Sequence, residues 1–155
     1  MTEADSRPPY DAYATIAGAF FGGLATVAAL SRRSAPGTAL EFAALAGATF
    51  KASRALSRER VGSFVRQPFV EGDAEIGEEE QPAGSGLQRA IGELVTCPRC
   101  LGTWTAAALV STEMVSPRFG RLLTWSLGAS AANDFLQAAF GALCAKANRL
   151  DDEAL

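Results

Sequence analysis

Two cysteines three residues apart, in the segment TCPRCLGTW at residues 96–104, are the side chains of this chain best suited to chemistry. Cys97 precedes a proline, and proline favours the first position of a helix because its missing N–H costs nothing there. We therefore expect Cys97 to cap a helix that begins at Pro98. The helix N-terminus and Arg99 should both favour the thiolate and lower the pKa of Cys97.

Three uses of these thiols are open from the residues alone. The first is a zinc site, for which Cys97 and Cys100 supply half of the four ligands that zinc takes. The chain has no histidine, so Cys144 and Glu93 could complete the set, or two copies could share one ion through their CxxC pairs. The second use is thiol redox chemistry, although no thioredoxin-like alternation of strands and helices surrounds the pair. The third is structural, with both thiols packed as small apolar side chains.

The composition excludes several other functions. Without histidine there is no Ser/His/Asp triad, and the sequence contains neither a GxxxxGK[ST] loop nor an EF-hand loop. The net charge of −3 gives no electrostatic footprint for a nucleic-acid partner. An odd number of cysteines, two of them in one CxxC, argues against a disulfide framework. An enzymatic activity would therefore depend entirely on the thiols, and a non-enzymatic role is favoured.

The elements that must position these residues are apolar helices. Residues 12–31 carry no charge and are long enough to cross about 30 Å of hydrocarbon as a helix. Within them Gly18 and Gly22 form a GxxxG pair, a spacing that lets helix backbones approach closely and could support a homodimer. We expect this segment to be a retained membrane anchor, with a buried core helix of a soluble protein as the alternative.

Three further helices are predicted, which gives an all-α membrane protein with about four transmembrane helices in two hairpins. Thr38 and Glu41 have capping-box spacing and predict a helix over residues 38–56. Two more are expected over 98–114 and 122–145. Residues 70–87 hold six acidic residues and are expected to be a flexible loop. The predicted organisation is a polar tail (1–11), a first hairpin with a basic juxtamembrane segment (12–69), the acidic loop (70–87), a CPxC-containing hairpin (88–146) and a C-terminal tail (147–155).

One carboxylate stands near the middle of the last apolar segment. Asp134 would lie deep in a membrane if that segment spans it, and an ionisable group at such depth needs a partner. Lys51 and Arg54 are the nearest basic candidates in depth. We expect a structural ion pair between one of them and Asp134, in preference to a transport or proton-relay role.

The distribution of basic residues predicts an orientation. With four spans, the two tails and the central segment share one side and hold nine lysines and arginines, whereas the two short turns hold four. The positive-inside rule then places both termini and the central loop in the cytoplasm, and the lipid bilayer is the first partner.

A basic segment and the CPxC motif together resemble a known family. The stretches ATFKASRALSRERVGSFVRQPFVE and ELVTCPRCLGTWTAAAL are similar to bacterial integral-membrane proteins grouped as domain of unknown function 1360, which include a sporulation-associated membrane protein. The resemblance covers roughly residues 48–113, with Lys51 where the family has arginine. It implies a location in the bacterial inner membrane and no established activity. The matching positions are Arg54, Glu59 (in place of aspartate), Arg66, Pro68, Glu93, Leu94, Cys97, Pro98, Cys100 and Trp104.

These observations favour a small integral-membrane protein with a structural or interaction role. The alternative is a membrane protein whose cytoplasm-facing thiols Cys97, Cys100 and Cys144 bind zinc or sense redox state.

Overall fold

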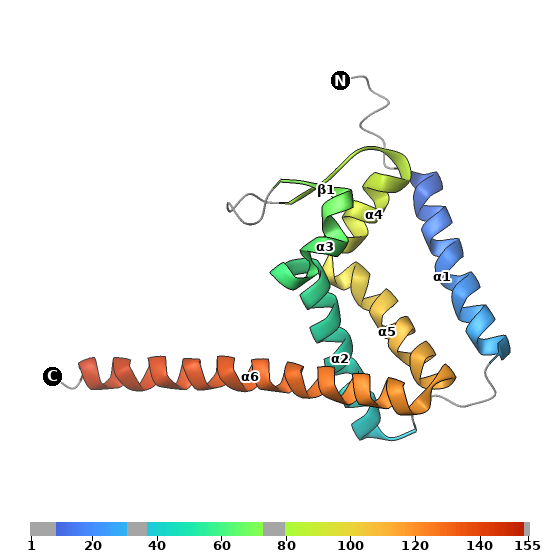
Figure 1. Ribbon diagram of the computed structural model, residues 1–155. Helices are drawn as coiled ribbons and strands as arrows, with labels where there is room; N and C mark the ends of the chain where they lie inside the picture. The colour runs from blue at the N-terminus through green and yellow to red at the C-terminus, as the bar shows by residue number, and fades with distance from the viewer. Residues whose placement is uncertain (1–8, 31–36, 73–79, 154–155) are drawn as a thin grey trace.

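The computed structural model describes residues 9–30, 37–72 and 80–153, and nearly all of them are helical (Figure 1). The all-α prediction is thus confirmed, with one small addition. Strands β1 (Val70–Glu71) and β2 (Gln81–Pro82) pair antiparallel, with Val70 opposite Pro82. Most of the N-terminal tail, the turn with Arg32 and Arg33, and the centre of the acidic loop lie outside the described residues. The helices are α1 (Tyr10–Leu30), α2 (Ala39–Arg58), α3 (Ser63–Arg66), α4 (Gly86–Thr96), α5 (Pro98–Val115) and α6 (Pro117–Glu153), with short 3₁₀ turns at Arg60–Gly62 and Gln67–Phe69.

Helix α1 is the apolar segment predicted from the sequence. By length and composition it can cross a membrane, and its most apolar stretch has a mean hydropathy of 1.6 and is not buried by the rest of the chain. Among the described residues no other helix is both long enough and apolar enough to meet the same description.

Helix α2 begins where the sequence predicts. The Thr38 hydroxyl accepts a hydrogen bond from the Glu41 backbone N–H, and the Glu41 carboxylate accepts one from the Thr38 backbone N–H. This reciprocal pair satisfies two of the donors that every helix N-terminus leaves free, and it confirms the capping box.

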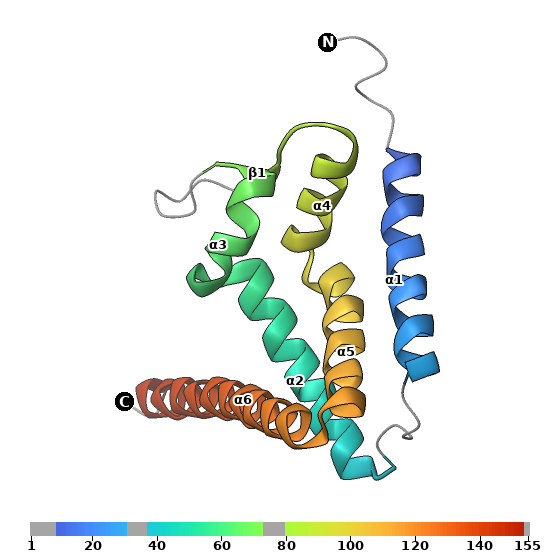
Figure 2. The ribbon, with the colours of Figure 1, turned by 45° about the vertical axis from the view of Figure 1, so that its right-hand side comes forward.

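The helices do not pair into the two expected hairpins. Helix α1 packs chiefly on α4 and α5, whereas α2 packs on α5 and α6. Helix α6 begins directly after Ser116, turns a sharp corner away from α5 and runs across α2 instead of returning along α5 (Figures 1 and 2). Its first residue is Pro117 and not Leu122, because proline suits a helix start and the arginines that follow it do not delay one.

Small side chains allow α2 and α6 to cross closely. A Cβ atom added to Gly128 would lie 2.9 Å from the backbone oxygen of Ala44, closer than real Cβ atoms approach. Ala48 and Ala131 beside this crossing are almost completely buried. Past the crossing α6 continues well beyond the other helices and carries large exposed apolar side chains at Leu136, Phe140 and Leu143 (Figure 1).

Helix α4 lies in a part of the chain for which the sequence predicted no helix. It starts at Gly86, inside the expected loop 70–87, and ends at Thr96, directly before Cys97. Cys97 is extended because a residue before proline avoids the helical conformation, so the chain bends between α4 and α5. This bend places the CxxC between two helices.

Candidate functional site

Cys97 caps α5 as its residue type and spacing predicted. Its Sγ accepts a hydrogen bond from the backbone N–H of Cys100 at 3.3 Å, and Pro98 occupies the first turn of the helix. The thiol of Cys100 donates to the same Sγ at an Sγ–Sγ distance of 2.7 Å. These two sulfur atoms, here called the thiol pair, are partly accessible.

The hydrogen bond from Cys100 is the main cause that lowers the pKa of the Cys97 thiol, and it outweighs the opposing effect of burial. Backbone N–H groups of the first turn and the charge of Arg99 act in the same direction. Cys97 is therefore the more acidic and more nucleophilic end of the thiol pair, because the thiolate is the reactive form of cysteine.

The other two candidate zinc ligands are not assembled beside the thiol pair. Glu93 accepts hydrogen bonds from the hydroxyl of Tyr13 and from Arg89 Nε, the latter at 3.2 Å. Cys144 is exposed on the part of α6 that extends away from the bundle (Figure 1). Within the described residues no group of three or more His, Cys, Asp or Glu side chains could hold a metal ion.

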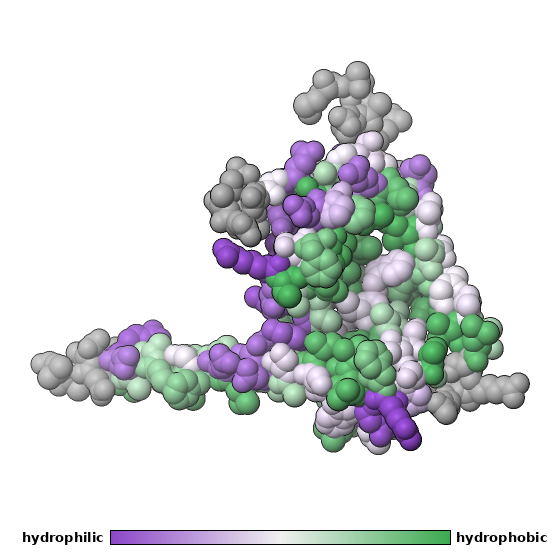
Figure 3. All heavy atoms as spheres, viewed as in Figure 1, coloured by the Kyte–Doolittle hydropathy of each residue, from purple (hydrophilic) through white to green (hydrophobic). Residues whose placement is uncertain are grey.

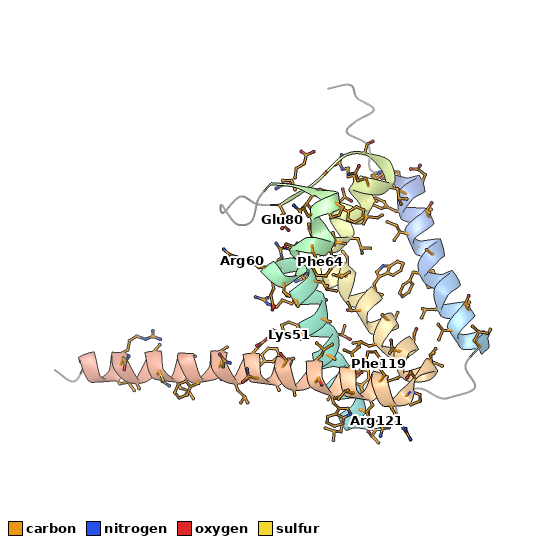
Figure 4. The ribbon with its side chains drawn as sticks, viewed as in Figure 1. Lys51, Arg60, Phe64, Glu80, Phe119 and Arg121 are labelled. Carbon is orange, nitrogen blue, oxygen red and sulfur yellow. The ribbon has the colours of Figure 1, made fainter. Side chains whose placement is uncertain are left out.

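The structure brings Lys51 and Asp134 together. Lys51 Nζ lies 3.0 Å from Asp134 Oδ2 and 3.1 Å from Glu59 Oε1, so one ammonium within α2 pairs with a carboxylate directly after that helix and with another on the crossing helix α6; this contact is here called the lysine bridge. Figure 4 shows Lys51 on the side of α2 that faces α6. Next to this bridge the rings of Phe50 and Phe135 stack with centroids 5.3 Å apart. Arg54 is exposed and belongs to none of the ion pairs among the described residues.

Arg66 has one of the most buried polar side chains among the described residues, and its contacts are here called the arginine clamp. Its side chain is 2% exposed, and its guanidinium binds both oxygens of Glu80, with Nε–Oε2 at 2.6 Å and Nη2–Oε1 at 3.0 Å. Its Nη1 donates to the carbonyl oxygen of Leu56 in the last turn of α2 and to that of Glu59, which directly follows the helix and also accepts from the Gly62 N–H. The clamp thereby joins the C-terminus of α2 to the β1–β2 hairpin.

The remaining motif positions connect α1 and the hairpin to the bundle. Trp104 on α5 packs edge-to-face against Phe20 of α1 with centroids 5.0 Å apart. The carbonyl oxygen of Pro68 accepts a hydrogen bond from Gln88 of α4 at 3.2 Å. Gly18 and Gly22 have open space where a Cβ would be, so no described part of this chain covers the GxxxG pair.

Sequence reasoning missed three residues that hold this arrangement. Glu80 lies among similar acidic residues, and no local signal distinguishes the one that pairs with Arg66. Tyr13 is the polar tip of an otherwise apolar helix, and only the fold brings its hydroxyl to Glu93, 80 positions away. Gly128 is one of many small residues, although Ala131 at helical spacing was a signal for close packing.

The fold and these contacts define a small helical protein in which a thiol pair, an arginine clamp and a lysine bridge involve helices α2, α3, α5 and α6 and a short hairpin. A family model described as "Protein of unknown function (DUF1360)" matches residues 44–140. The match covers more than half of the chain, and the chain belongs to this family. No curated protein and no solved structure matches the chain.

Proposed function

We propose that this protein is an integral-membrane scaffold of the bacterial inner membrane with a non-enzymatic, structural role. The observation that carries the proposal is α1, which is free of charged residues from Ala12 to Leu30 and packs on α4 and α5 along one side while its most apolar stretch is not buried. Exposed apolar side chains on α2 and α6 add to it. In Figure 3 apolar side chains gather over the middle of the bundle, whereas hydrophilic ones lie near β1 and α4 at one end, at the opposite end and along α6.

In this proposal the end near β1 and α4 faces the cytoplasm. The four-span arrangement and the cytoplasmic position of both termini rest on the positions of the basic residues and on the positive-inside rule. The exposed GxxxG pair of α1 is free to contact lipid or α1 of a second copy, because such pairs let backbones approach closely.

Extraction of membranes with alkaline carbonate tests the anchor. We expect the wild-type protein to stay in the membrane pellet. An arginine at the centre of a membrane helix costs about 2.5–3.5 kcal/mol of insertion free energy, so Ala19→Arg should release a large share of the protein. Ala19→Leu is the matched control and should remain in the pellet. Release of the wild type would contradict the anchor, whereas retention of both variants would show that helices other than α1 hold the chain in the membrane.

A second function is favoured by the 2.7 Å approach of the two sulfur atoms. We propose that the thiol pair reports redox state by forming a Cys97–Cys100 disulfide. The Cys97 thiolate attacks a disulfide oxidant such as oxidised glutathione and releases one reduced glutathione. Cys100 then displaces the second as its own proton is lost, so that two electrons leave the protein. Mass spectrometry after titration with oxidised glutathione should show loss of two hydrogens in wild type and none in Cys100→Ala.

Zinc is the competing use of the same thiols. Since the described residues of one chain supply two clustered ligands, we take a zinc site to need the thiol pairs of two copies. Protein purified without chelators would then contain about one zinc per two chains, and Cys97→Ser would remove it. Metal-free protein with freely reacting thiols would leave the redox proposal in place.

A further inference from the structure

A cavity of about 530 Å³ lies between α1, α4 and α5. This volume is within the range of about 300–1,000 Å³ that is usual for sites of small molecules. Its walls are mostly apolar, and four of its side chains are aromatic: Tyr13, Phe20, Phe21 and Trp104. It is separate from the arginine clamp and from the lysine bridge, and it shares only Cys100 with the thiol pair.

Three of the four aromatic rings that line the cavity form a connected group. Phe20 packs edge-to-face against Trp104 at 5.0 Å and against Phe21 at 5.4 Å between centroids. The faces of such rings carry negative potential and attract cations, most strongly for tryptophan.

Among the described residues, Glu93 is the one acidic residue that lines the cavity, and no lysine or arginine lines it. One carboxylate oxygen accepts from the hydroxyl of Tyr13, which orients the carboxylate at the cavity wall. The other accepts from Arg89, whose own side chain lies outside the lining and is 41% exposed. The charge facing the cavity is thus negative, although Arg89 offsets part of it.

We propose that this cavity binds an apolar organic cation, meaning a hydrophobic molecule with a quaternary or delocalised positive charge. Such a charge donates no strong hydrogen bonds and is weakly hydrated, so aromatic faces and one carboxylate suffice to bind it. An anion would be repelled by Glu93. A free molecule and the trimethylammonium head of a lipid share this chemistry.

Fluorescence of Trp104 provides the test. The chain has two tryptophans, so Trp125→Phe leaves Trp104 as the only emitter. In nonionic detergent without lipid, tetraphenylphosphonium should quench this emission saturably. Triphenylphosphine oxide, which is aromatic but neutral, should bind at least about tenfold more weakly. Absence of saturable quenching, or equal affinity for the cation and the neutral compound, would overturn the proposal.

Variants that change the charge at Glu93 and Arg89 distinguish a cation site from a cavity that binds any apolar compound. Glu93→Gln should weaken tetraphenylphosphonium binding about fivefold to tenfold and leave the neutral compound unaffected. Glu71→Gln changes an exposed carboxylate outside the cavity and should alter neither. Arg89→Gln removes the competing cation and should tighten binding, which keeps the test decisive if Glu93→Gln fails to fold. An unchanged or weaker affinity in Arg89→Gln would count against the site.

Competition identifies the source of the cation. Soluble dihexanoylphosphatidylcholine should displace tetraphenylphosphonium if a lipid headgroup is the occupant. Tetraphenylphosphonium binding that resists this competitor assigns the cavity to a free organic cation.

Discussion

Arg66 is a charged side chain with almost no contact with solvent, and Glu80 compensates its buried charge. Both guanidinium–carboxylate contacts are short, and the remaining N–H groups reach the carbonyl oxygens at the end of α2. When a buried ion pair loses one member, the other is left as an uncompensated charge in a low-dielectric environment. A single substitution in the arginine clamp should therefore lower the stability of the whole bundle.

We expect Glu80→Gln to lower the free energy of unfolding by about 3 kcal/mol, because it leaves the buried guanidinium unpaired. Chemical denaturation in detergent, followed by circular dichroism, measures the effect. Glu71→Gln on the same hairpin is exposed and should stay within about 0.5 kcal/mol of wild type. Equal stabilities of these two variants would show that the clamp is dispensable.

The thiol pair predicts a pH dependence of alkylation. Because the pKa of Cys97 is lowered, its thiolate persists to a lower pH than an ordinary cysteine, whose pKa is about 8.5. In a Cys144→Ser background, the midpoint of the iodoacetamide rate against pH should lie below that value. Cys100→Ala removes the main hydrogen bond and should move the midpoint upward. An unchanged midpoint would mean that Cys100 does not stabilise the thiolate.

At the scale of elements, α2 and α6 can cross closely because the residue of α6 at the contact is a glycine and has no side chain. Gly128 meets the backbone of Ala44, and the contact leaves no room for a Cβ atom. Next to the crossing, the lysine bridge and the stacked rings of Phe50 and Phe135 fix its position along both helices. If the two helices no longer approach closely at Gly128, the crossing, the lysine bridge and the ring stacking should all weaken.

Gly128→Leu should destabilise the protein by about 2–3 kcal/mol, because overpacking forces the two helices apart. The matched control is Gly141→Leu on the same helix, where an added Cβ meets nothing within 4 Å. Thermal unfolding of both variants provides the comparison. If Gly141→Leu is affected as strongly as Gly128→Leu, helix propensity and not the crossing is responsible.

The helices differ in how far the sequence could predict them. Uncharged runs and the Thr38–Glu41 cap predicted α1 and the start of α2, and Pro98 predicted the start of α5, because these signals are local. Helix α4 was missed because its first residues continue a segment rich in glycine and acids, although Leu87, Ala90, Ile91, Leu94 and Val95 follow the helical spacing of an apolar face. Helix α6 extends past Ala145 because charged residues do not end a helix, although they do interrupt an apolar run.

At the scale of the whole molecule, local sequence signals were insufficient to predict which helices pack against one another. Short connections predicted that α1 would pair with α2 and α5 with α6, but side-chain fit gave other neighbours. Trp104 accepts Phe20, which draws α1 to α5, and the small residues of the crossing draw α6 onto α2. The same limit applies to the candidate zinc ligands: no spacing rule relates Cys97 to Cys144, and among the described residues no group of three ligands forms.

The proposed orientation makes a prediction about Cys144. In a Cys97→Ser, Cys100→Ser variant, Cys144 is the one remaining thiol. Lys146 and Arg149 follow it closely, so the positive-inside rule places it near the cytoplasmic surface. A membrane-impermeant maleimide should label it in inside-out vesicles and not in right-side-out vesicles. The reverse pattern would place the C-terminus on the outside.

Helix α6 also has the proportions of a lever. Its pivot is the crossing at Gly128, and the 25 residues from there to Glu153 span about 38 Å at 1.5 Å per residue. A tilt of about 10° at the pivot would carry its far end through roughly 6–7 Å, given that length. A change that breaks the ion pair between Lys51 and Asp134 and lets α6 tilt would therefore produce its largest displacement at the C-terminal end of α6.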